Sequence, residues 1–139
     1  MAIRTETRAR ALALQLLYAW DQMADQEADR RAVWARVLQL VRAAPAIQDR
    51  AIGLADGVVR ARARLDPALE QAADRWRLER LAVVDRNLLR LAALEFETDT
   101  PPKVVIDEAV RLARWFGGPK SPGFVNGILD RLAHDRGWL

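Results

Sequence analysis

Apolar residues recur along this chain at intervals of three and four positions, the spacing typical of amphipathic α-helices. The clearest case is residues 101–132, where two such patterns meet at a glycine- and proline-rich corner. The inward positions predicted for the first helix are Val105, Ala109, Leu112 and Phe116, widened by Val104 and Trp115; those of the second are Val125, Ile128, Leu129 and Leu132. Pro101 and Pro102 suit the entry to the first helix, and Gly117 and Gly118 predict a left-handed end to it. The second helix is predicted to begin near Ser121.

The same spacing predicts helices through the rest of the chain. The first begins after an N-cap at Thr5 or Thr7 and runs to about Met23, and the others cover residues 25–44, 47–64, 66–74 and 76–97. Asp66 and Pro67 indicate a cap and a first-turn proline that open the helix at 66–74. The inward positions predicted for the second helix are Val33, Val37, Leu40 and Val41. No segment alternates in the period-two manner of a half-buried strand, so the protein is predicted to be all-α.

Composition narrows the classes of function. The 139 residues are 51% hydrophobic, enough for a packed core, and they include no cysteine and a single histidine, His134. These counts exclude disulfides, thiolate metal sites and most histidine-based catalysis, so we expect no metal and no cofactor. No apolar run is long enough to span a bilayer and the first residues are too charged for a signal peptide, so a cytoplasmic protein is expected.

The basic charge is carried almost entirely by arginine, because Lys103 and Lys120 are the only lysines. Arginine suits bidentate phosphate contacts, but an arginine-rich surface also results from genome composition or from ion-pair networks. Position favours the first reading for Arg4, Arg8 and Arg10, since cations at a helix N-terminus oppose the helix dipole and do not stabilise the helix. A basic N-terminal arm is typical of nucleic-acid contacts.

The corner before the last predicted helix gathers a cation, a hydroxyl and an aromatic ring. Lys120, Ser121 and Phe124 lie at a helix N-terminus, where free amides and the helix dipole favour an anion. Catalytic motifs do not fit: residues 117–121 lack the first glycine of a phosphate-binding loop, and Asp107 and Glu108 diverge by about 100° on their helix. The sequence therefore predicts a binding protein and not an enzyme.

Four stretches carry a family resemblance: residues 8–20, 81–92, 102–113 (PKVVIDEAVRLA) and 121–130 (SPGFVNGILD). With these, the chain resembles the NusB family of bacterial transcription antitermination factors. The resemblance implies one RNA-binding domain over residues 1–139, with about seven helices in two three-helix halves that share a core. It also implies pairing with the small ribosomal protein NusE, recognition of single-stranded boxA RNA, and a place in the RNA polymerase antitermination complex.

The resemblance assigns roles to individual residues. The RNA-binding residues that it implies are Arg4, Arg8, Arg10, Lys120, Ser121, Phe124 and Asn126. NusE binding is expected at Asp85 and Tyr18. The chain departs from the family in its interrupted basic arm, in a shorter segment over residues 93–100 and in Pro122-Gly123 before the phenylalanine. We expect these departures to alter affinity and the setting of the corner.

Several alternatives stay open at this stage. NusB-like domains also precede RNA cytosine methyltransferase domains, but the chain ends at Leu139, so we expect no such enzyme. A helical protein-interaction module, or a homodimer without direct RNA contact, is a second hypothesis. Phe124 stacks on a base or packs in the core. Asp85 binds a partner or pairs internally with an arginine such as Arg86 or Arg90.

Overall fold

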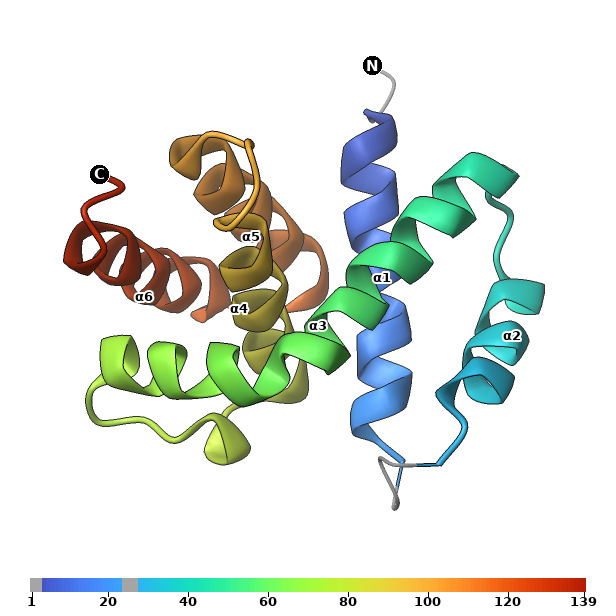
Figure 1. The fold of residues 1–139 in the computed structure, drawn as a ribbon, viewed down its shortest axis with the longest axis horizontal. Helices are drawn as coiled ribbons and strands as arrows, with labels where there is room; N and C mark the ends of the chain where they lie inside the picture. Colours follow the sequence, from blue (N-terminus) through green and yellow to red (C-terminus); the bar gives the residue numbers. More distant parts are fainter. Residues whose placement is uncertain (1–3, 24–27) are drawn as a thin grey trace. The chain divides into compact units, whose positions relative to one another are not determined.

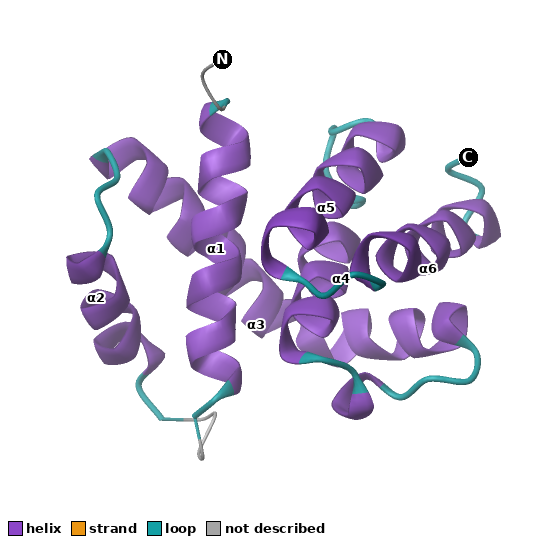
Figure 2. Ribbon diagram, turned by 180° about the vertical axis from the view of Figure 1, so that it is seen from behind, coloured by secondary structure: helices purple, strands orange, loops and turns teal. Residues whose placement is uncertain are grey.

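The computed structural model describes residues 4–23 and 28–139, and every regular element in them is helical (Figures 1 and 2). The elements are α1 (Thr5–Asp21), α2 (Arg30–Leu40), α3 (Pro45–Ala73), the short 3₁₀ helix η1 (Leu78–Arg80), α4 (Val83–Glu95), α5 (Pro102–Phe116) and α6 (Ser121–Asp135). The all-α prediction is confirmed. The chain divides within α3 into two compact units, one ending at Asp56 and the other beginning at Gly57.

The first helix has the predicted buried face but not the predicted cap. Its buried apolar residues include Ala9, Leu12, Ala13, Leu16, Leu17 and Trp20. The helix begins at Thr5, with Arg4 at the N-cap position and no side-chain capping bond. Thr7 is buried inside the first turn. The proposed threonine cap was therefore wrong, and α1 gains its stability from packing and not from its end.

Helix α2 is shorter and turned differently from the prediction. The Asp29 side chain caps it by accepting the Arg31 amide at 3.0 Å, while the predicted start at residues 25–27 lies outside the described residues. Trp34 is the buried residue, and its Nε1 donates to the Leu16 carbonyl at 2.8 Å. Leu40, predicted to face inward, is 87% exposed. The indole buries more apolar area than a leucine and finds a hydrogen-bond partner, so it determines which face is buried.

Helix α3 continues through Pro67, although the sequence predicted two helices separated near Asp66. A proline inside a helix removes one amide donor and crowds the carbonyl four residues earlier, which here belongs to exposed Ala63. Leu65 and Leu69 are buried on either side of Pro67 and hold the helix to the core of the second unit. Asp66 is not a cap.

The second unit is built on pairwise packing of α4, α5 and α6 (Figure 1). Its most deeply buried side chains come from all three helices and from α3: Leu69, Leu88, Leu89, Leu112, Val105, Val125 and Leu129. A polar joint fastens α3 to α4, because Arg90 donates to both oxygens of Asp66 at 2.9 and 3.0 Å. Arg90 also donates to Asn87 Oδ1 at 3.1 Å, so this buried guanidinium is well satisfied.

Two boundaries in the second unit differ from the prediction. Residues 76–82 do not extend α4 but form an irregular segment and η1. On α5, the predicted stripe is right at Val105, Ala109 and Leu112, whereas Val104, Trp115 and Phe116 are 42%, 47% and 40% exposed. An apolar stripe in the sequence is wider than the face that this helix can bury. None of the helices in the described part of the chain has the length and apolarity needed to cross a membrane.

Candidate nucleic-acid interface

The corner between α5 and α6 is set by one close approach. A Cβ atom on Gly117 would lie 2.5 Å from Ser121 Cβ and 2.8 Å from the Ala113 carbonyl oxygen, so only glycine fits. Gly117 has φ −94° and ψ −178°, which is extended backbone, and the predicted left-handed helix end was wrong. Space, and not a special dihedral angle, requires glycine here.

The buried side chain of Ser121 stabilises the turn between α5 and α6. It is 5% exposed, and its Oγ accepts the Gly118 amide at 3.0 Å. This burial does not suit the predicted RNA contact, because the hydroxyl already serves the turn. Lys120 is exposed at the N-cap position of α6, and Asn126 is exposed six residues further along. Among the described residues Lys120 has no ion-pair partner, so its charge is available to an anion.

Phe124 is neither fully exposed for stacking on a base nor fully packed in the core, the two alternatives left open by the sequence. It is half-buried, and its ring centroid is 5.7 Å from that of Trp76 at an interplanar angle of 48°. Trp76 is 56% exposed. Sequence reasoning missed Trp76 as a surface residue, since it placed the residue at the start of a helix. The signal was present in Arg75-Trp76-Arg77, an aromatic side chain between two cations.

The predicted basic arm is only partly exposed. Arg4 and Arg8 are exposed, and the acid between them, Glu6, forms an exposed ion pair with Arg50 at 3.3 Å. Arg10 is 5% exposed and interacts within the fold, so its guanidinium is not presented to a ligand. The helical periodicity explains the difference, because Arg10 follows directly after buried Ala9 and shares its side of α1 with buried Leu14.

The predicted partner residues are accessible to different degrees. Tyr18 is 46% exposed on α1. Asp85, the third residue of α4, is half-buried, and its Oδ1 is inaccessible to water and has no hydrogen-bond partner in the described part of the molecule. Neither suggested arginine pairs with it: Arg86 donates to the carbonyls of residues 79 and 81, and Arg90 binds Asp66.

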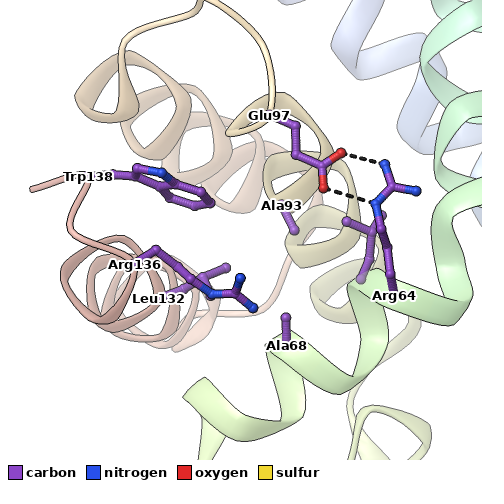
Figure 3. Close-up of a pocket in the computed structure, with 8 residues that line it drawn as sticks. Arg64, Ala68, Ala93, Glu97, Leu132, Arg136 and Trp138 are labelled. Atoms are coloured by element: carbon purple, nitrogen blue, oxygen red, sulfur yellow. Dashed lines mark hydrogen bonds and ion pairs between the residues drawn. The ribbon is translucent and has the colours of Figure 1, made fainter.

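A cavity of about 160 Å³ lies elsewhere in the second unit (Figure 3). Its lining residues are Arg64, Leu65, Ala68, Ala93, Glu97, Leu132, Arg136 and Trp138. Arg64 donates to both carboxylate oxygens of Glu97, at 2.6 and 3.2 Å. These hydrogen bonds, together with the attraction of the carboxylate, raise the pKa of Arg64 above its ordinary value. The pair neutralises itself, and Arg136 is the other charged residue in the lining.

No group of His, Asp or Glu side chains within residues 4–23 and 28–139 is arranged to hold a metal ion. The accessible chemistry near the start of α6 is instead a cation and two aromatic rings, with the Asn126 amide about 200° around the helix from Phe124. A surface of this kind can bind phosphates and unsaturated rings.

The chain resembles known proteins in sequence and in fold. The family model for NusB matches residues 7–134. The transcription antitermination protein NusB of Anaeromyxobacter dehalogenans (strain 2CP-1 / ATCC BAA-258) is 44% identical over 128 residues, covering 91% of this chain and 89% of the relative. The structure of T. maritima NusB superposes with a TM-score of 0.80 at 32% identity, covering 97% of this chain and 94% of that one.

A crystal structure of the antitermination factors NusB and NusE in complex with dsRNA contains a chain with a TM-score of 0.80 and 26% identity. The superposition covers 96% of this chain and 99% of that one. The family match, the extent of the identity to the relatives and the fold lead to one conclusion: the chain belongs to the NusB family, whose members are transcription antitermination proteins.

Proposed function

We propose that this protein is an RNA-binding transcription antitermination factor that pairs with NusE and binds single-stranded boxA RNA. The observation that carries the proposal is the start of α6, where exposed Lys120 and half-buried Phe124 are held by a corner that only glycine can form. A related NusB occurs with NusE and dsRNA in one structure, which supports NusE and RNA in general as partners.

The first part of the proposed mechanism is electrostatic. Arg4 and Arg8 in the first unit and Lys120 in the second are exposed cations that hold phosphates without reading sequence. Arg10 and Ser121 leave the predicted set of direct contacts because both are buried. Arg10 interacts within the fold, and the Ser121 hydroxyl holds the turn that precedes it by accepting the Gly118 amide.

The second part is base stacking. A single-stranded base exposes its ring faces and can lie against an aromatic side chain, whereas the bases of a duplex are covered by their neighbours. Phe124 is the ring assigned to this contact. Exposed Asn126 lies about 200° around α6 from Phe124, so its amide is assigned to a different nucleotide. Single-stranded RNA is therefore favoured over a duplex as the ligand.

NusE is the proposed protein partner, with Asp85 and Tyr18 as contacts. A buried carboxylate oxygen without a donor is destabilising in the free protein, and a donor from a partner removes that cost. Tyr18 is exposed and combines an apolar ring with a hydroxyl, a residue type common at interfaces. With NusE bound, the protein joins the RNA polymerase antitermination complex.

A second candidate function is a helical interaction module, including a homodimer, without direct RNA contact. The exposed apolar side chains of α5, Val104, Trp115 and Phe116, favour it. Sedimentation of the protein alone and with NusE separates the alternatives. A homodimer that persists with NusE, and that does not bind RNA, supports the second candidate.

The direct test of the proposal is a titration of labelled single-stranded boxA RNA with the protein, alone and with NusE. Affinity is expected to rise with NusE and to fall as salt increases. A scrambled RNA of the same length and a duplex of the boxA sequence serve as controls. Equal affinity for boxA RNA and both controls would contradict the proposed recognition.

A further inference from the structure

Trp76 is an exposed aromatic side chain that the fold has no evident need to expose. It lies between the end of α3 and η1, with 56% of its surface accessible, and its ring touches Phe124 at a centroid separation of 5.7 Å. The tilt of 48° means that the two rings do not stack face to face. The contact with Phe124 therefore leaves much of the indole surface free for a second ring.

The backbone that carries Trp76 is fastened on both sides. Before it, Asp74 adopts a left-handed φ of 61°, and its carboxylate lies 3.8 Å from Arg131 of α6. After it, buried Leu78 anchors η1. Arg86 of α4 donates to the carbonyls of residues 79 and 81, which closes the end of η1. The indole is thus presented from an ordered segment, which lowers the entropy cost of binding a ligand.

The charges around Trp76 favour a polyanion. Arg75, Arg77 and Arg80 are exposed in the same short segment. Arg77 has an exposed partner in Glu79 at 3.7 Å, but Arg75 and Arg80 have no ion-pair partner among the described residues. Lys120 stands one helical turn before Phe124 and adds a further free cation.

We propose that Trp76 and Phe124 form a two-ring platform that binds unpaired bases of RNA, with Arg75, Arg80 and Lys120, which have no ion-pair partner among the described residues, binding the adjoining phosphates. This inference rests on the proposed RNA-binding function and adds Trp76 and its arginines to the contact set. Trp76 offers the larger and more exposed ring, so it binds one base on its free surface, while Phe124 orients the indole and contacts a neighbouring base.

The charge distribution selects RNA over a protein partner as the occupant. Isolated exposed arginines beside a tryptophan match alternating phosphates and bases along a single strand. A protein interface built around a tryptophan usually surrounds it with apolar residues and few unpaired charges at its centre. The surroundings of Trp76 are of the RNA-binding kind, with exposed arginines beside the indole.

The test compares four variants in complex with NusE, using fluorescence anisotropy of labelled single-stranded boxA RNA. Trp76→Ala and Trp76→Leu are expected to bind about 5- to 150-fold more weakly, the loss typical of removing one stacked base. Trp76→Phe keeps a flat ring and most of the affinity. Because stacking releases no counterions, the slope of affinity against salt stays unchanged in all three.

Trp115→Ala is the matched control. Trp115 is also exposed, at 47%, in the same unit and beside a phenylalanine, with ring centroids 6.5 Å apart, but it lies at the end of α5. It is expected to bind RNA like the wild type. Equal losses in Trp115→Ala and Trp76→Ala would overturn the proposal, since the effect would then follow from removing any exposed indole.

The remaining outcomes separate this inference from the proposed function. If the wild-type complex does not bind boxA RNA, the proposed function fails. If it binds and Trp76→Ala binds equally well, only the platform is overturned. Wild-type RNA affinity in Trp76→Leu with loss in Trp76→Ala would show that Trp76 merely covers Phe124. If Trp76→Ala binds NusE more weakly than the wild type when no RNA is present, Trp76 contacts NusE and the platform is overturned. Melting temperatures of all variants identify any loss of folding.

Discussion

Replacing Gly117 with alanine tests the claim that close packing sets the corner before α6. The new Cβ would meet Ser121 Cβ at 2.5 Å and the backbone carbonyl oxygen of Ala113 at 2.8 Å. The carbonyl belongs to α5 and cannot rotate away as the end of a flexible side chain could. Overpacking of this kind costs about 1–3 kcal/mol. Loss of the hydrogen bond between the Gly118 amide and Ser121 adds about 0.5–1.5 kcal/mol.

Alanine also restricts the unfolded chain, which returns about 0.4–1 kcal/mol. The net loss in the free energy of unfolding is therefore about 0.5–4 kcal/mol. Each kcal/mol lowers the melting temperature by roughly 4 °C. Thermal denaturation followed by circular dichroism measures it.

Gly118→Ala provides the matched control for Gly117→Ala. A Cβ on Gly118 would meet only Ser121 Oγ at 4.0 Å, an ordinary contact. This variant is expected to stay within about 1 kcal/mol of the wild type. The Gly117→Ala variant is expected to bind RNA with lower affinity than the Gly118→Ala variant, because the clash displaces Lys120. Equal melting temperatures for the two variants would refute the packing argument.

Three further changes test other parts of the account. Asp85→Ala is expected to weaken NusE binding in calorimetry while the melting temperature holds, because its Oδ1 has no donor in the free protein; unchanged NusE affinity would remove it from the interface. Replacing Arg4 and Arg8 together with alanine should reduce the slope of log K against log salt for single-stranded RNA by roughly 1.4, or 0.7 for each lost phosphate contact. An unchanged slope would show that Arg4 and Arg8 are solvated and do not contact the RNA. Asp66→Ala should cost about 3 kcal/mol in urea denaturation, since it leaves Arg90 largely buried without its carboxylate; a loss near zero would mean that water replaces the pair.

Helical spacing predicted the fold class and most of the core, because burial along α1, α5 and α6 follows one continuous face. It failed where two apolar residues compete for the interior. On α2, Trp34 is buried and Leu40 is exposed, and only tertiary packing decides between them. It failed again at Pro67, where burial of Leu69 outweighs the local cost of a proline inside α3.

The sequence predicted which residue types form the candidate site better than it predicted which of those side chains are exposed. Lys120 and Asn126 are exposed as an RNA contact requires, but Arg10 and Ser121 are buried. A sequence does not reveal that a hydroxyl is engaged by an amide three residues earlier, or that an arginine turns inward. Trp76 was missed although it lies between two arginines, because a helix was predicted to begin there; its contact with Phe124 joins positions that are distant in the chain.

The most direct test of the central claim is photo-crosslinking of 4-thiouridine-labelled boxA RNA to the protein in complex with NusE, followed by mass spectrometry of tryptic peptides. The account predicts crosslinks in the peptide Ser121–Arg131, which carries Phe124 and Asn126, and their loss when unlabelled boxA RNA competes. Crosslinks confined to NusE, with none on that peptide or on the N-terminal helix, would contradict the claim that this chain itself holds the RNA.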